Sequence, residues 1–175
     1  QVGLLDNVIL PLLKENVELQ LNAGAEVVMI FDSTAHQLAE EDLNIYLEKT
    51  FNMLVKEFPN KVGYYAKDGV NYETIIAKQD DPQINLAGMG IDSNVDLRDF
   101  FKKTSYGFVQ GNFSEHFLTL PHEEFLPKLD TFIEQMSALS PEERSGWVCG
   151  LGHGVLKTTP QENVKEFVQR IRASF

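Results

Sequence analysis

Hydrophobic positions near the start of the chain follow the spacing of a helix and then change to the pattern of a strand. Over residues 4–22 the apolar side chains recur every three or four positions, which places them on one side of a helix. Ala23-Gly24-Ala25 then ends the helix, since glycine is the usual terminator. Residues 26–33, EVVMIFDS, form a continuous apolar run rich in β-branched side chains. This run is typical of a strand that is buried on both faces.

The same alternation of strand and helix continues to the end of the chain, for about five rounds in all. It predicts an α/β fold with a parallel sheet and right-handed crossovers, covered on both faces by helices or closed as a barrel. The length of 175 residues indicates one domain over 1–175. The later predicted elements are a helix over 35–58, a strand in 61–69, a short helix near 72–79, a strand in 84–93, a helix over 96–103, a strand in 107–114, a helix over 121–139, a strand in 147–154, and a helix from about Pro160 with Thr159 as its N-cap.

Polar residues and glycines gather at the carboxyl end of each predicted strand. In parallel sheets and barrels these ends meet at one rim, where ligands bind. We therefore expect a binding site there. The clusters are Asp32-Ser33, Lys67-Asp68-Gly69, Asp92-Ser93-Asn94, Gln110-Gly111-Asn112 and Gly152-His153-Gly154.

Two of these clusters supply the main chemical candidates. Glycines on both sides of His153 leave its imidazole unshielded and allow positive φ angles and close approach to a ligand. Ser33 can donate a hydrogen bond to the same ligand, act as the N-cap of the next helix, or form a nucleophilic pair with His153, although no G-x-S-x-G motif surrounds it. Phe31 is either an apolar wall of the pocket or part of the core. The alternative for His153 is an ordinary glycine-rich turn.

Composition and charge narrow the class of protein. The chain has 15 Lys and Arg against 26 Asp and Glu, a net charge of -11, which argues against binding to nucleic acid or to an anionic membrane. No apolar run is long enough to span a bilayer and no signal peptide opens the chain. The one cysteine excludes an intrachain disulfide and indicates a reducing, cytoplasmic location.

The remaining candidates for metal or cofactor chemistry are weak. Cys149 has no partner cysteines at ligand spacing, so we predict no metal and expect it to be a small buried side chain. The G-x-G-x-x-G spacing of a dinucleotide site is absent. His36, His116 and His122 are expected to be solvated or to cap helices.

Three segments together resemble the uroporphyrinogen decarboxylase family: AGAEVVMIFDS, VQGNF and GLGHGVLKTTPQENVKEFVQRI. They match the family's AGA…iFDS, lQGNldP and nLGHGv…tP.eNV segments in the same order. The resemblance implies part of a (β/α)₈ TIM barrel, about the last five β/α units, and a homodimer. It implies removal of four acetate carboxyl groups from uroporphyrinogen III to give coproporphyrinogen III in tetrapyrrole biosynthesis, without metal or organic cofactor.

The resemblance also assigns roles to individual residues. Ser33 and His153 match a serine and a histidine that hydrogen-bond substrate carboxylates, and Phe31 matches the apolar wall under the macrocycle. The family's substrate-binding arginines, its aspartate and its cleft tyrosine have no matching position in this chain. Departures from the family pattern are Thr34 and Ser93 in place of tryptophans, and Phe113-Ser114-Glu115 in place of ldP.

The resemblance therefore leads to expectations about the chain as a whole. It predicts that Gln1 falls inside the helix before the FDS strand, that the amino-terminal portion is absent, and that the chain is inactive alone. Two alternatives are a methyltransferase of the same superfamily that uses no zinc, and a half-barrel without catalytic activity. In the latter, the open edges of the sheet bind another chain.

Overall fold

The structure is a computed structural model that describes residues 2–67, 72, 76, 85–104 and 107–175. It divides into two compact units, residues 1–89 and 90–175, and each is described by itself. The single domain expected over 1–175 stays a prediction. The short helix expected near 72–79 lies mostly outside the described residues.

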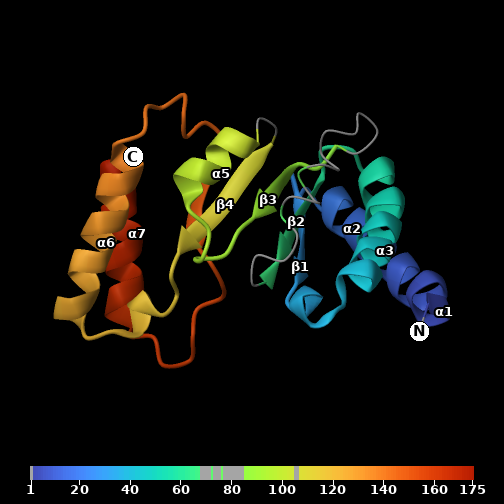
Figure 1. The fold of residues 1–175 in the computed structure, drawn as a ribbon, viewed down its shortest axis with the longest axis horizontal. Helices are drawn as coiled ribbons and strands as arrows, with labels where there is room; N and C mark the ends of the chain where they lie inside the picture. Colours follow the sequence, from blue (N-terminus) through green and yellow to red (C-terminus); the bar gives the residue numbers. More distant parts are fainter. Residues whose placement is uncertain (1, 68–71, 73–75, 77–84, 105–106) are drawn as a thin grey trace. The chain divides into compact units, whose positions relative to one another are not determined.

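The first unit begins with a helical stretch over residues 2–22 and contains two adjacent strands (Figure 1). Strand β1, Val28–Asp32, pairs in parallel with β2, Val62–Ala66. Every residue of β2 is buried, as expected for a strand with both faces covered. The helical elements are α1 (Val2–Leu4), a π-helical segment (Leu5–Ile9), α2 (Leu10–Asn22), a 3-10 helix (Ala35–Gln37), α3 (Glu40–Thr50) and a second π-helical segment (Phe51–Val55).

The core of the first unit lies between these helices and the strands. Phe51 and Tyr64 are both 1% exposed, and their rings meet edge to face with centroids 5.5 Å apart. Leu47 on α3 and Leu54 in the following segment are fully buried. The apolar side of α3 and of the segment that follows it therefore packs inward, which supplies most of the stabilisation of an amphipathic helix, whereas Leu12 of α2 is 64% exposed.

The second unit continues the pattern of strand followed by helix. Strand β4, Phe108–Phe113, pairs in parallel with β5, Trp147–Leu151. The helices are α5 (Leu97–Lys103), a 3-10 helix (Phe117–Thr119), α6 (His122–Ser137) and α7 (Gln161–Ser174). The short strand β3, Gly88–Gly90, has its first two residues in the first unit and its last residue in the second. The strands follow the order β1-β2-β3-β4-β5 in one five-stranded sheet. This α/β arrangement with a parallel sheet confirms the predicted fold class and is consistent with part of a (β/α)₈ barrel.

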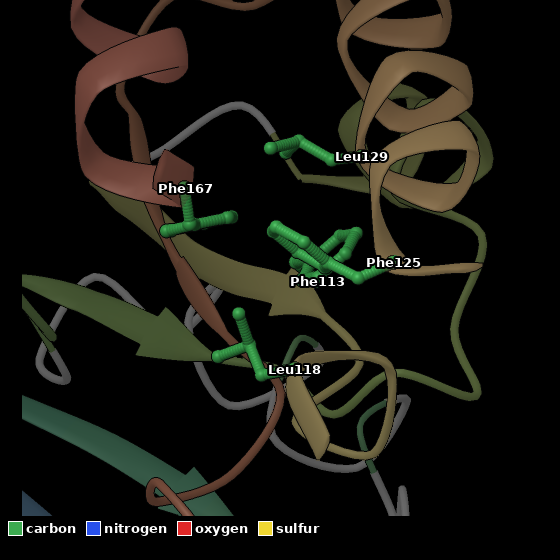
Figure 2. Packing of buried hydrophobic residues seen from close by; sticks show 5 residues of the cluster. All are labelled: Phe113, Leu118, Phe125, Leu129 and Phe167. Atoms are coloured by element: carbon green, nitrogen blue, oxygen red, sulfur yellow. The ribbon is translucent and has the colours of Figure 1, made fainter. Parts of the chain in front are cut away.

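An aromatic cluster forms the core of the second unit (Figure 2). Phe113, at the end of β4, lies with its ring centroid 5.2 Å from that of Phe167 on α7 and 6.2 Å from that of Phe125 on α6. Leu118 and Leu129 complete the buried set. The end of β4 is thus anchored under the two helices that follow it.

The structure corrects several predicted boundaries. The helix expected over 35–58 starts only at Glu40, because Leu38 and Ala39 take extended backbone angles after a 3-10 turn. The polar cluster Gln110-Gly111-Asn112 lies within β4, toward its carboxyl end, as expected. Pro160 is the N-cap residue of α7 and not its first helical residue, and the hydroxyl of Thr159 makes no capping bond. Such shifts of one residue are usual at helix ends.

Candidate functional site

The end of β1 presents two of the three predicted site residues to solvent. Phe31 is 64% exposed and contacts Tyr65 with a centroid distance of 5.8 Å, so it is not the core residue that the alternative interpretation assumed. Ser33 is exposed in the turn that follows. It is not an N-cap, because that position belongs to Thr34 for the 3-10 helix and to Ala39 for α3.

A buried carboxylate fixes the turn that carries Ser33. Asp32 is 9% exposed, and its Oδ2 accepts a hydrogen bond of 2.9 Å from the hydroxyl of Tyr64. Its Oδ1 accepts a bond of 3.3 Å from the backbone N–H of Thr34. Burial, followed by the nearby Asp32 charge, raises the pKa of Tyr64, and the same two causes in the same order raise the pKa of Tyr46. Both phenols therefore stay protonated and able to donate at neutral pH.

The end of β5 presents the third predicted residue. His153 is half-buried in the segment after β5, and its Nδ1 lies 3.4 Å from the carbonyl oxygen of Gly154. A contact of that length holds the ring weakly. The imidazole is thus left with hydrogen-bonding capacity for a ligand.

The glycines around His153 serve a different purpose from the one that the sequence suggested. Neither Gly152 nor Gly154 has a positive φ angle. A Cβ on Gly152 would lie 2.3 Å from the backbone nitrogen of Ser93, whereas one on Gly154 would meet nothing within 4 Å. Gly152 is therefore required for close packing against the chain's own backbone.

The three predicted site residues are divided between the two units. Phe31 and Ser33 lie together at the end of β1 in the first unit, and His153 lies in the second. A shared pocket for Ser33 and His153 therefore stays a prediction. Of the other expected rim positions, Lys67 follows β2 directly, and Asp68 and Gly69 lie outside the described residues.

The other histidines and the cysteine take mainly structural positions. His36 and His116 are exposed, as expected. The expectation for His122 was incomplete, because its Nδ1 lies 2.8 Å from Oδ1 of the fully buried Asn163. Cys149 packs against the aromatic core, and burial raises its pKa to about 12, so its thiol is not a nucleophile at neutral pH.

The described part of the chain has neither a cluster of metal-ligating side chains nor a helix that could span a membrane. No three His, Cys, Asp or Glu side chains there come together in a way that could hold a metal ion. No helix there has the length and apolar character needed to cross a membrane.

A cavity in the second unit contains residues that the sequence analysis did not single out as a site. Its volume is about 490 Å³, and Phe31, Ser33 and His153 do not line it. Asn112 does, and it belongs to the Gln-Gly-Asn cluster noticed in the sequence. Lys128, on α6, also lines the cavity. The sequence did not indicate it as a binding residue, because a single lysine on a helix is ordinarily solvated.

Comparison with known proteins gives a consistent result. The family model described as Uroporphyrinogen decarboxylase (URO-D) matches residues 4–174. A uroporphyrinogen decarboxylase of Prochlorococcus marinus subsp. pastoris is 30% identical over 161 residues, which are 89% of this chain and 43% of that protein. One of Orientia tsutsugamushi is 28% identical over 164 residues, 90% of this chain and 45% of that protein. One of Chloroflexus aggregans is 30% identical over 164 residues, again 90% and 45%. The chain thus spans less than half the length of these relatives.

Proposed function

The chain belongs to the uroporphyrinogen decarboxylase family, and from this premise we propose that it forms part of the site at which uroporphyrinogen III loses its four acetate carboxyl groups to give coproporphyrinogen III. Ser33 and His153 hydrogen-bond carboxylates of the substrate, and Phe31 packs against the macrocycle. The enzyme is a carboxy-lyase of tetrapyrrole biosynthesis that needs no metal or organic cofactor. The proposal includes the homodimer and the cytoplasmic location that the family resemblance implies.

The end of β1 is the observation that supports this proposal most directly. A phenylalanine that is 64% exposed stands beside an exposed serine, on a turn held by a buried aspartate. An exposed aromatic ring next to a hydroxyl suits a ligand that combines an apolar ring with polar arms. A tetrapyrrole with carboxylate side chains has both features.

The chemistry requires little more than positioning and charge stabilisation. Protonation of the pyrrole α-carbon, next to the ring carbon that bears the acetate, gives a cation that takes up the electron pair of the carbon–carbon bond as carbon dioxide leaves. The exocyclic methylene that forms then gains a proton and the α-carbon loses its added proton, which leaves a methyl group and restores the pyrrole. Groups that hold the substrate in that geometry supply much of the rate acceleration. In this proposal Ser33 and His153 are such binding groups, and neither is the principal acid.

Charge explains why we propose that the chain is inactive alone. Turnover of a substrate with eight carboxylates needs cationic partners, whereas hydrogen bonds and ring packing are enough for weak binding. This chain has 15 basic against 26 acidic residues, and its two proposed polar contacts, Ser33 and His153, are hydrogen-bonding groups rather than fixed cations. In this proposal the cations do not come from residues 1–175, and neither do the aspartate and the tyrosine of the family, which have no matching position in this chain.

Binding and turnover of uroporphyrinogen III by the purified chain, under anaerobic conditions, test the proposal. We expect calorimetry to show binding that His153→Ala and Phe31→Ala each weaken by about threefold or more. Leu19→Ala is the matched control for Phe31→Ala, because Leu19 is 62% exposed on α2 and should leave binding unchanged.

Chromatography of the products completes the test. We expect no coproporphyrinogen from the chain alone. Its formation would contradict the proposed inactivity, whereas failure of uroporphyrinogen to bind would contradict the proposed site. Consumption of a methylated corrinoid in its place would support the alternative methyltransferase.

A further inference from the structure

The cavity of the second unit has the size and composition of a binding site for a small molecule. At about 490 Å³ it lies within the range of ligand pockets, about 300–1,000 Å³. It lies between the loop that follows β3, the end of β4 and one side of α6, all within residues 90–175. The lining residues that bear on binding are Asp96, Arg98, Asn112, Phe117, Lys128 and Phe132.

A buried amide gives the cavity a fixed hydrogen-bond acceptor. Asn112 is 8% exposed, and its Nδ2 donates to the carbonyl oxygens of Asp92 at 2.8 Å and of Val95 at 2.6 Å. Both protons of the amide are thus used by the chain, which fixes the orientation of the side chain. Among the described residues no donor lies within hydrogen-bond distance of its Oδ1. This oxygen is not one of the completely buried side-chain atoms that lack a partner, so it stays accessible. Asn112 therefore offers an oriented acceptor to a ligand that carries an N–H or O–H.

The charge of the cavity is opposite to that of the chain. The ionisable residues that line it are Arg98, Lys128 and Asp96. Asp96 is the N-cap of α5, and its carboxylate also pairs with the guanidinium of Arg98 at 3.5 Å. Within the described chain no carboxylate pairs with Lys128, whose Nζ lies 5.4 Å from the ring centroid of Phe117. In a chain of net charge -11, this leaves one unpaired cation at the cavity and favours an anionic ligand.

Aromatic rings form the apolar part of the wall. Phe113 contacts Phe117 and Phe132 edge to face, with centroids 5.7 and 5.3 Å away. Phe117 is 36% exposed, so part of its surface is open to a ligand. Rings in this arrangement favour a flat aromatic partner.

We propose that this cavity binds a small aromatic carboxylate that also carries a ring N–H or O–H donor. The ligand's carboxylate pairs with Lys128, its ring packs against Phe117 and Phe132, and its donor reaches Oδ1 of Asn112. The inference rests on none of the residues of the proposed decarboxylase site. It therefore stands or falls separately from that function.

Indole-3-carboxylate is a suitable probe, because its ring N–H and its carboxylate lie on opposite sides of the ring. Calorimetry or ligand-observed NMR with the 175-residue chain measures the binding. We expect Lys128→Met to weaken binding by about threefold or more, since exposed ion pairs are modest. We expect Gln135→Trp, which fills the cavity from an exposed position on α6, to abolish it.

Control variants distinguish binding in this cavity from non-specific attraction of the anionic probe to lysines on the surface. Lys165→Met, at an exposed lysine on α7, should bind the probe as the unchanged chain does, and circular dichroism should show that all variants are folded. 1-Methylindole-3-carboxylate, which lacks the N–H, should bind more weakly than the probe. The proposal is overturned if the unchanged chain does not bind indole-3-carboxylate, or if Lys128→Met and Gln135→Trp bind it equally well.

Discussion

Gly152 is the residue that constrains the backbone leading to His153. It follows β5 directly, its N–H donates to the carbonyl oxygen of Phe113 at 2.9 Å, and its Cα faces the backbone of Ser93. There is no space for a side chain between the two segments. The position of the imidazole therefore depends on a glycine that makes no contact with a ligand itself.

Substitution of this glycine gives a matched pair of variants. Gly152→Ala places a methyl group 2.3 Å from the nitrogen of Ser93, so the backbone must shift. We expect it to lower the free energy of unfolding by about 2 kcal/mol or more, as overpacking does. Gly154→Ala meets nothing within 4 Å and should change the free energy of unfolding by less than about 0.5 kcal/mol. Urea denaturation measures both, and equal stability of the two variants would contradict the proposed close packing.

At the scale of elements, one buried amide joins α7 to the segment before α6. Asn163 is fully buried on α7, and its Nδ2 donates to the carbonyl oxygens of Leu118 and Leu120 at 3.0 and 2.9 Å. Its Oδ1 lies 2.8 Å from Nδ1 of His122, the first residue of α6. On the outer side, Arg170 pairs with Asp130 of α6. The position of α7 against α6 thus depends on polar contacts as well as on the aromatic core.

Removal of that amide should destabilise the second unit. Asn163→Ala leaves two carbonyl oxygens without their donor, which we expect to lower the free energy of unfolding by about 2–3 kcal/mol. Gln169→Ala, at an exposed position of the same helix, should change it by less than about 0.5 kcal/mol. Thermal unfolding measures both variants, and a stability of Asn163→Ala equal to that of Gln169→Ala would show that the buried contacts contribute nothing.

At the scale of the whole molecule, the sheet has central strands and edge strands of different character. All of β2 is buried, whereas Phe31 of β1 and Val148 of β5 are 64% and 44% exposed. The expectation that both faces of every strand are covered is therefore wrong for the two edge strands. An edge strand also leaves half of its amides without a strand partner.

Hydrogen exchange of the native chain should reveal this difference. We expect the amides of β2 and β4 to exchange most slowly within their own units, and those of β1 and β5 to exchange faster. Mass spectrometry of peptides from each strand measures the rates. Equal protection of edge and central strands would contradict the sheet order and indicate that another strand covers the edges.

Some elements of the fold could be predicted from the local sequence pattern, and others could not. The helical spacing over 4–22 and the β-branched run of 26–33 depend only on local pattern, and both elements appear where expected. The boundary at 35–39 did not follow from pattern, because a 3-10 turn and two extended residues replace the expected first helical turn. Ser93, Asn94 and Asn112 of the cavity belong to two of the clusters at which a binding site was expected, whereas its residues on α6 were not foreseen, since they lie on a segment further along the chain.

The sequence by itself determined the α/β class, the order of strands and helices, and the family, because periodicity and motifs are properties of neighbouring residues. Only the tertiary structure decided what each special residue does. It showed that Asp32 is buried against Tyr64, that Gly152 is required by the backbone of Ser93, and that Asn163 holds two carbonyl groups. These roles depend on contacts between distant parts of the chain, and such contacts are set by packing and by the need of buried polar groups for partners.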